Sequence, residues 1–310
     1  MDPIFYVYLI AGFILLWKGG DMLVDGADAF ARSHGVPPTI AGVFILGFGT
    51  SMPELAVTAM ATLDGNTGIA VGNVVGSNIA NVGLVLGIAA LISAVYVNRF
   101  LLKIEIPVGI AASALAFILV MDGRVDRMDG FILLGAFLLY AGFAMGTIRH
   151  RDVDDGEPPP KRPWFDLGKA TLALGAVVGG AELFTEGAVA AAQALNVSDT
   201  AIGLKLVAIG TSLPELATAI AAARAKKTDL VVGNVIGSNI FNLQLVLGTA
   251  GVLVDQAVEA RIPEFDMPTM CVLAILPLII ALVANRRVGR IAGVILVGIY
   301  AGWLIFDPYV

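Results

Sequence analysis

The sequence predicts an all-α polytopic membrane protein with ten transmembrane helices in two inverted repeats of five helices. The first observation is composition, because 58% of the 310 residues are hydrophobic and only 14% are charged. The second is a mean hydropathy of +0.88, too high for a soluble protein, with apolar runs long enough to span a bilayer. The third is a duplication: residues 47–87 and 208–248 align without a gap and are identical at 22 of 41 positions.

The apolar runs, at roughly 20 residues per span, define the predicted helices. The first run begins at Pro3, with no basic segment before it and no small-residue cleavage site after it, so we interpret it as a retained helix. The ten predicted helices cover residues 3–31, 37–62, 69–94, 104–121, 128–148, 166–195, 199–223, 229–254, 267–285 and 288–306. The acidic and proline-rich segment 149–165 is the predicted linker between a first repeat, residues 1–148, and a second, residues 166–310.

The basic residues predict the orientation of these helices. Fourteen Lys and Arg residues fall in one set of alternate loops and three fall in the other. Short cytoplasmic loops collect Lys and Arg. We therefore expect the central linker in the cytoplasm and both termini outside.

The duplication predicts how the halves are related. The two copies lie 161 residues apart, and the same offset pairs Asp21 with Glu182 and Asp25 with Glu186. Because each half has five spans, an odd number, the second copy must enter the membrane in the opposite orientation. Inverted repeats of this kind are typical of secondary transporters.

The first duplicated motif runs from Gly49 to Glu54 and again from Gly210 to Glu215. Each copy places a carboxylate at membrane depth, which by default indicates a functional site. Each copy also contains a proline, which has no N–H to donate to the helix ladder. The backbone oxygens near the break are therefore candidate ligands, at Gly47, Thr50, Ala208 and Thr211.

The second duplicated motif runs from Gly72 to Asn81 and again from Gly233 to Asn242. Its serine and last asparagine are four residues apart, so their side chains share one helix face. Its glycines, four residues apart, predict close approach of neighbouring helices. The other asparagines are expected to cap or cross-link helices; they are Asn73, Asn78, Asn234 and Asn239.

All the candidate ligands are hard oxygen donors, which suit calcium, or sodium of similar radius, better than a transition metal. The predicted metal-ligating side chains are Glu54, Glu215, Thr50, Thr211, Ser51, Ser212, Ser77, Ser238, Asn81 and Asn242, with backbone oxygens at Gly47 and Ala208. Helix packing remains an alternative role for the serines and asparagines of the second motif. With only His34, His150 and Cys271 available, we expect no zinc or haem cofactor and no enzyme activity.

Both copies resemble the α-repeats of the sodium/calcium exchangers in the calcium/cation antiporter superfamily, and the whole chain is similar in layout to small prokaryotic members. The resemblance rests on the duplicated motifs GTS-x-PE and GN-x-x-GSN-x-x-N. It implies a ten-helix exchanger of the prokaryotic plasma (inner) membrane. In such an exchanger, calcium and about three sodium ions compete for one central cluster during alternating access.

The resemblance also implies roles for individual residues. Glu54 and Glu215 correspond to ligands shared by calcium and sodium. Thr50 and Thr211 correspond to residues whose carbonyls lie near calcium. The residues that correspond to outer sodium sites are Ser51, Ser77, Ser212, Ser238, Gly47 and Ala208.

One position departs from the family pattern. Several exchangers have aspartate where this chain has Asn81 or Asn242, so the cluster holds only two formal negative charges. Calcium neutralises two charges, whereas three sodium ions leave one positive charge, so exchange at that ratio would be electrogenic. The two asparagines also argue against a potassium-dependent mechanism.

Two other functions remain open from the sequence. A pair of close carboxylates can carry protons, which allows proton/calcium antiport, and a passive cation channel is a further alternative. We expect calcium and sodium ions and the lipid bilayer as the only partners, no nucleic acid, and a monomeric protein. Lys205, within the seventh predicted span, is interpreted as snorkelling to the external interface. Asp122, Asp126 and Asp129 are interpreted as a solvated external loop.

Overall fold

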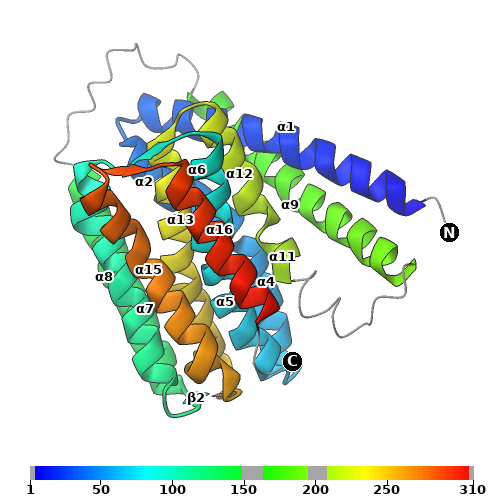
Figure 1. Cartoon of the computed structure of the whole chain (residues 1–310), viewed down its shortest axis with the longest axis vertical. Helices are drawn as coiled ribbons and strands as arrows, with labels where there is room; N and C mark the ends of the chain where they lie inside the picture. Colours follow the sequence, from blue (N-terminus) through cyan, green and yellow to red (C-terminus); the bar gives the residue numbers. More distant parts are fainter. Residues whose placement is uncertain (1–3, 149–162, 195–207, 307–310) are drawn as a thin grey trace.

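The protein is almost entirely helical in the residues that its computed structural model describes, 4–148, 163–194 and 208–306. Three parts of the prediction lie outside these residues: most of linker 149–165, the first part of the predicted helix 199–223, and Lys205. Figure 1 shows a bundle of upright helices with α1 and α9 side by side, projecting from one flank. The two segments therefore pair with one another and leave much of their outer surface to the surrounding membrane.

The first half contains five long helical segments, three of which include π-helical turns (η). In chain order its elements are α1 (Ile4–Ser33), α2 (Pro38–Ala41), η1 (Gly42–Gly47), α3 (Phe48–Thr50), α4 (Met52–Leu63), α5 (Thr67–Ala80), η2 (Asn81–Leu86), α6 (Gly87–Ile92), β1 (Val95–Tyr96), η3 (Leu101–Glu105), α7 (Ile106–Val120), β2 (Arg124–Val125) and α8 (Arg127–Ile148).

The second half follows the same order wherever it is described. Its elements are α9 (Pro163–Ala194), α11 (Ala208–Thr211), α12 (Leu213–Arg224), α13 (Thr228–Ile240), η5 (Phe241–Val246), α14 (Leu247–Leu253), β3 (Gln256–Ala257), η6 (Ile262–Asp266), α15 (Met267–Val283), β4 (Arg287–Val288) and α16 (Arg290–Ile305).

The apolar helices agree with a membrane-spanning fold. Among the described residues, seven helices are long and apolar enough to cross a membrane, or eight if the bent segment from Pro38 to Leu63 is one span. α16 is a shorter apolar helix. Many large apolar side chains on the outer helices are exposed, including Leu139 at 78% and Leu172 at 76%, as expected for surfaces in contact with lipid.

The structure adjusts one helix boundary and corrects the interpretation of one acidic residue. α9 is Pro163–Ala194, close to the predicted helix 166–195. Asp129 is not part of a solvated loop but lies in the first turn of α8, where its carboxylate accepts the Asp126 N–H at 3.0 Å. In return, the N–H groups of Asp129 and Met128 donate to Asp126 and lower the pKa of that carboxyl. Together, these bonds cap the helix.

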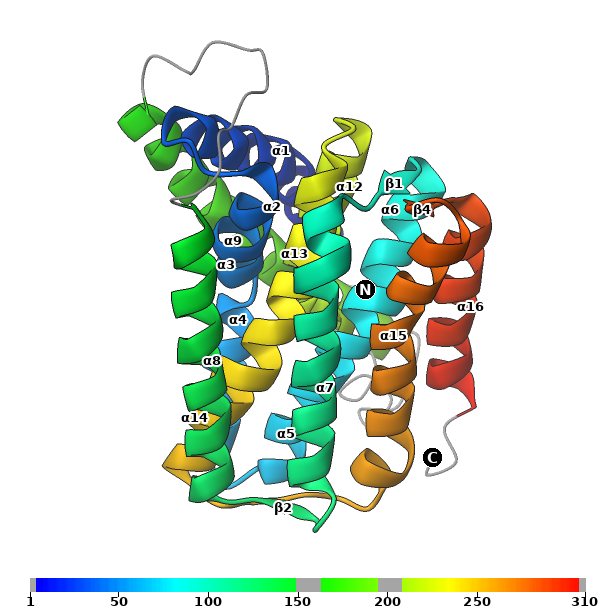
Figure 2. The same cartoon turned by 90° about the vertical axis from the view of Figure 1, so that its left-hand side faces the viewer.

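Two pairs of very short strands link the halves at opposite ends of the bundle. β1 pairs with β4, with Val95 opposite Val288, and β2 pairs with β3, with Arg124 opposite Ala257. Figure 2 shows β1 and β4 at one end and β2 at the other. Each half therefore contributes one strand to each end, and hydrogen bonds join the halves at both.

Glycines allow the second motif helix to approach the first half very closely. A Cβ placed on Gly237 would lie 2.7 Å from both the Cα and the carbonyl oxygen of Val43 in η1, and one on Gly233 would lie 3.0 Å from the Cα of Gly42. The predicted close approach is thus confirmed for α13. At Gly72 no described atom lies within 4 Å of the position that a Cβ would take, so the prediction is not met by the described neighbours of α5.

Packing at Gly237 provides a matched test of this contact. Gly237→Ala adds a methyl group against the Val43 backbone, and overpacking of this kind costs about 1–3 kcal/mol. Gly135→Ala makes the same change in α8, where no described atom lies within 4 Å, and it should be neutral or slightly stabilising. We expect thermal unfolding in detergent to show a lower melting temperature for Gly237→Ala alone. Equal melting temperatures would contradict the close contact.

Candidate functional site

Two broken helices place the duplicated carboxylates at the centre of the bundle. Ser51, with φ −84° and ψ 3°, interrupts the helix between α3 and α4, and the axes bend by 41°. Ser212 has nearly the same backbone angles between α11 and α12. Glu54 and Glu215 therefore lie in the first turn of a new helix, where unpaired N–H groups and the helix dipole favour negative charge.

Both carboxylates are completely buried, and their surroundings differ. Glu215 Oε1 lies within hydrogen-bonding distance of the hydroxyls of Ser51, at 3.4 Å, and Ser238, at 3.5 Å. Glu215 Oε2 and both oxygens of Glu54 have no hydrogen-bond partner among the described residues. The two carboxylates are also close enough to repel each other when both are charged. Buried charges are usually paired, bound to a metal ion or neutralised by a proton, so this pair needs either cations or protons.

Four further predicted residues present buried oxygens without a partner. These oxygens are Ser77 Oγ, Ser212 Oγ, Asn81 Oδ1 and Asn242 Oδ1. With the three carboxylate oxygens they make seven, all from predicted site residues. A buried oxygen without a hydrogen bond costs about 1–3 kcal/mol, and more when it is charged. So many acceptors near the two helix breaks are best satisfied by cations.

Reciprocal asparagine pairs hold the amide oxygens of the second motif. Asn81 Nδ2 donates to Asn239 Oδ1 at 3.0 Å, and Asn242 Nδ2 donates to Asn78 Oδ1 at 3.4 Å. Each site asparagine is thereby bound by its nitrogen to the opposite half, while its oxygen has no partner. The prediction that Asn78 and Asn239 cross-link helices is confirmed.

A second reciprocal network binds the threonines of the first motif. Thr50 Oγ1 lies 3.4 Å from Asn234 Oδ1, and Asn234 Nδ2 donates to Thr218 at 3.1 Å. The equivalent network has the same distances: Thr211 Oγ1 lies 3.4 Å from Asn73 Oδ1, and Asn73 Nδ2 donates to Thr58 at 3.1 Å. Thr50 Oγ1 also donates to the carbonyl of Leu46 at 2.9 Å. The threonine hydroxyls are therefore already engaged as donors.

Sequence reasoning missed Thr58 and Thr218. The offset of 161 pairs Thr58 with Ala219 and Thr218 with Val57, so an ungapped comparison of the copies does not align them. Two signals were available. Each threonine is a polar residue in an apolar helix, and each lies three or four residues after its glutamate, on the same helix face.

The two predicted backbone ligands lie at the ends of helical segments. Gly47 is the last residue of η1, and its carbonyl accepts the Ser51 N–H at 3.1 Å and the Ser238 hydroxyl at 3.2 Å. Ala208 is the first residue of α11, directly after a gap in the described chain. The structure thus brings Gly47 into contact with Ser51 and Ser238.

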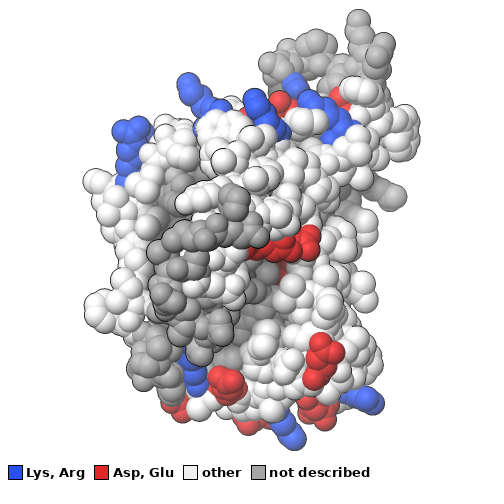
Figure 3. Space-filling view, turned by 90° about the vertical axis from the view of Figure 1, so that its right-hand side faces the viewer, with Lys and Arg blue, Asp and Glu red and all other residues white. Residues whose placement is uncertain are grey.

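A cavity of about 510 Å³ reaches the first motif of the second half. Its described lining includes Gly210, Thr211 and Pro214 on that side, and Glu182 and Glu186 from α9. Figure 3 shows acidic side chains part-way along the molecule, between an end rich in Lys and Arg and an end rich in Asp and Glu. The lining of this cavity is mainly apolar, and Glu182 and Glu186 are its two acidic residues. Carboxylates at a cavity that reaches the first motif favour cations over anions there.

The opposite end is closed by ion pairs between α1 and the α12–α13 turn. Asp21 lies 3.5 Å from Arg224, and Lys227 lies 3.0 Å from Asp25 and 3.2 Å from Asp28. The partner of Asp21 is thus Arg224. These ion pairs join α1 to the α12–α13 turn at this end of the bundle.

The donor set is unsuited to a transition metal. In the part of the chain that the structure describes, no three His, Cys, Asp or Glu residues lie together as a metal site. The cluster combines two carboxylates with neutral hydroxyl and amide oxygens, the ligand type of calcium and other hard cations.

Comparison with known proteins agrees with this donor set. The family model described as sodium/calcium exchanger protein matches residues 4–146 and 167–307. This chain belongs to the sodium/calcium exchanger family. The exchanger resembles the sodium/calcium exchanger MaX1 of Methanosarcina acetivorans, with 30% identity over 100% of both chains. It is also 34% identical to the putative antiporter CaxA of Alkalimonas amylolytica, over 96% of both chains.

A solved structure gives the same result for the fold. The exchanger superposes on the sodium–calcium exchanger NCX_Mj, soaked with sodium and strontium, with a TM-score of 0.87, 34% identity and coverage of 98% of each chain. The resemblance inferred from the duplicated motifs is therefore confirmed, and the exchanger is an integral membrane protein that handles sodium and calcium.

The buried oxygens predict stabilisation of the exchanger by calcium. Saturating calcium should raise the melting temperature, because a ligand at 100 times its Kd stabilises the folded state by about 2.7 kcal/mol. Glu54→Gln should abolish the shift, whereas Glu105→Gln should retain it. Glu105 is an equally buried carboxylate outside the cluster, with the Tyr140 hydroxyl at 2.6 Å. Loss of the shift in both variants, or in neither, would contradict a calcium site at Glu54.

Proposed function

We propose that the exchanger is a sodium/calcium antiporter that moves one calcium ion against about three sodium ions by alternating access. The observation that carries this proposal is the set of seven buried oxygens without partners, from both copies of both motifs. Four buried oxygens outside the predicted site, on Thr62, Glu105, Gln244 and Gln256, also lack a partner among the described residues. The seven are set apart because all of them belong to the duplicated motifs. The ions are cargo, so the proposal needs no cofactor and no enzyme chemistry.

The geometry supports a division of labour among the ligands. Glu54 and Glu215 are proposed to bind both ions, with Thr50 and Thr211 contributing backbone carbonyls because their hydroxyls are engaged elsewhere. Asn81 and Asn242 are proposed to contribute their unpaired amide oxygens. The proposed outer sodium ligands are Ser51, Ser77, Ser212 and Ser238, with the carbonyls of Gly47 and Ala208.

Reciprocal contacts support two inverted repeats of five helices, residues 1–148 and 166–310, joined by a linker that reaches no further than residue 165. The equivalent helices α1 and α9 pack antiparallel, because Gly12 approaches Gly180 whereas Gly26 approaches Asp166. The asparagine and threonine networks also exchange partners between the halves. We propose ten transmembrane helices related by a pseudo-two-fold axis in the membrane plane.

The charge distribution supports an orientation in the prokaryotic inner membrane. The end rich in Lys and Arg is proposed to face the cytoplasm, with the linker there and both termini outside. The ion pairs of Asp21 and Asp25 then close the cytoplasmic side, while the cavity lined by Glu182 and Glu186 opens toward the outside. One chain supplies the whole cluster, so a monomer suffices.

A vesicle assay tests the exchange directly. Vesicles loaded with sodium and diluted into sodium-free medium should take up labelled calcium, because outward sodium flow drives inward calcium flow. Glu54→Gln and Glu215→Gln should each reduce uptake at least 100-fold, since each removes half of the charge that balances calcium; one lost charge-assisted contact costs about 3–5 kcal/mol. Glu105→Gln serves as the matched control and should retain uptake.

Other outcomes of the same assay identify the alternatives. Uptake driven by a pH gradient but not by a sodium gradient would establish proton/calcium antiport instead. Rapid calcium flux that needs neither gradient would indicate a passive channel. Unchanged sodium-driven uptake in both glutamate variants would reject the proposed site while retaining the exchange.

Clamping the membrane potential tests how many sodium ions are exchanged for each calcium ion. Each turnover at three sodium ions per calcium carries one net positive charge out of the sodium-loaded vesicle, so uptake builds an inside-negative potential. Potassium on both sides with valinomycin should collapse that potential. We expect faster sodium outflow and severalfold more calcium accumulation than without the ionophore at the same potassium concentration. No difference would indicate an electroneutral ratio of two sodium ions per calcium.

A further inference from the structure

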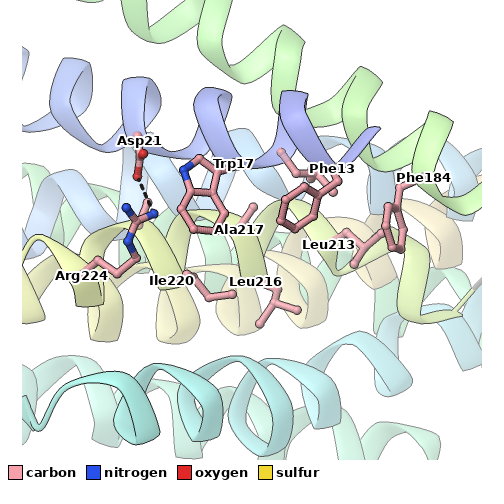
Figure 4. Close-up of a pocket in the computed structure, with 11 residues that line it drawn as sticks. Phe13, Trp17, Asp21, Phe184, Leu213, Leu216, Ala217, Ile220 and Arg224 are labelled. Carbon is pink, nitrogen blue, oxygen red and sulfur yellow. Dashed lines mark hydrogen bonds and ion pairs between the residues drawn. The ribbon is translucent and has the colours of Figure 1, made fainter. Parts of the chain in front are cut away.

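An apolar groove runs along the outer flank of the exchanger, between α1 and α12. Figure 4 shows Phe13 and Trp17 on α1, with Leu213, Leu216 and Ile220 opposite them on α12. Phe184 of α9 closes one end, and Asp21 and Arg224 mark the other. Phe13 is 53% exposed and Trp17 is 42% exposed, so the groove opens sideways toward the membrane.

The length of the groove matches one leaflet of the bilayer. Leu213 and Arg224 are separated by 11 residues of continuous helix, which is about 16 Å. Half of a hydrocarbon core of about 30 Å is about 15 Å. An acyl chain that starts at the membrane surface beside Arg224 can therefore run along the groove to Leu213, near the bilayer centre.

The polar end of the groove suits an anionic headgroup. The Arg224 guanidinium lies 4.2 Å from the centroid of the Trp17 ring, an arrangement that fixes its position at the interface. It forms an ion pair with Asp21 at 3.5 Å, and both side chains are substantially exposed. Since a guanidinium has five N–H donors, one exposed carboxylate at that distance satisfies only part of them. Lys18 and Lys226, near Trp17 and Arg224 in sequence, are also exposed.

The equivalent position in the other half has a different character. At the offset of 161 residues, Leu63 corresponds to Arg224 and Glu182 corresponds to Asp21. The cavity beside α4 and α9 is accordingly lined by Glu182 and Glu186. An anionic headgroup would be repelled there. The duplicated fold thus offers one flank site that attracts an anionic lipid and one that does not.

We propose that this groove is a binding site for an anionic glycerophospholipid of the leaflet at the Lys- and Arg-rich end. One acyl chain lies between Phe13, Trp17 and Leu216, and the phosphate binds Arg224 in competition with Asp21. The site is separate from the buried ion cluster, but it uses the Asp21–Arg224 ion pair that is proposed to close the cytoplasmic side. Lipid binding itself does not depend on the proposed exchange.

Native mass spectrometry of the delipidated exchanger tests the headgroup. The probes are phosphatidylglycerol and phosphatidylcholine with identical acyl chains, and one equivalent of phosphatidylglycerol should bind preferentially. Arg224→Gln should weaken its binding about fivefold, the effect of one cationic side chain near the surface. Asp21→Asn should strengthen it, because a competing carboxylate is removed. Arg124→Gln, at an exposed position in the turn before α8, should have no effect.

The groove itself is tested by steric and optical changes. Leu216→Trp should reduce binding of phosphatidylglycerol, whereas Leu139→Trp, at a position that is 78% exposed, should not. If Leu216→Trp does not fold, phosphatidylglycerol with brominated acyl chains should still quench tryptophan emission in vesicles of the unmodified exchanger more than brominated phosphatidylcholine does. That excess should vanish in Trp17→Phe. Equal binding of both lipids, an unchanged affinity in Arg224→Gln, or quenching unaffected by Trp17→Phe would overturn the proposal.

Discussion

The structure depends on one constraint, which is that two interacting carboxylates are buried without enough donors among the described residues to satisfy them. Glu54 and Glu215 are completely buried, and three of their four oxygens have no hydrogen-bond partner in the part of the chain that the structure describes. In an apolar interior an uncompensated charge is very costly. On the proposed function, cations would supply the interactions that these oxygens lack. The helix breaks at Ser51 and Ser212 place each carboxylate in the first turn of a new helix, where the dipole favours negative charge.

The surrounding network explains how these oxygens stay in place without a bound ion. Asn78 and Asn239 bind the amide nitrogens of Asn242 and Asn81, which leaves the amide oxygens for a ligand. The Gly237 contact holds α13 against η1 and so positions Ser238 beside Gly47 and Glu215. Such support reduces the loss of side-chain freedom on binding, which is the general advantage of a preorganised site. The cluster is thus held by contacts between the two halves of the chain.

The sequence was sufficient for the helical membrane fold and the family, because long apolar runs and a duplicated motif are local signals. It also identified all seven unpaired oxygens of the cluster, since each belongs to a duplicated polar residue. It did not identify the Thr58 and Thr218 contacts, because these threonines occupy neighbouring and not equivalent positions of the repeat. The pairing of Asp21 with Arg224 was also missed, since it joins residues 203 positions apart, whereas Lys18 was the nearer cation in sequence. Long-range contacts of this kind depend on how helices pack, which periodicity does not specify.

The two halves differ in the residues that can pair with the acidic side chains of α1 and α9. Arg224 and Lys227 pair with Asp21 and Asp25, but the equivalent partners of Glu182 and Glu186 are Leu63 and Asn66. Exposed ion pairs of this type contribute about 0.2–1 kcal/mol each. On the proposed alternating-access mechanism, closure at the basic end therefore gains a small stabilisation that closure at the other end lacks. A difference of about 1 kcal/mol between two states shifts their populations by roughly fivefold. These ion pairs are therefore one contribution to the balance between the two orientations of the empty exchanger.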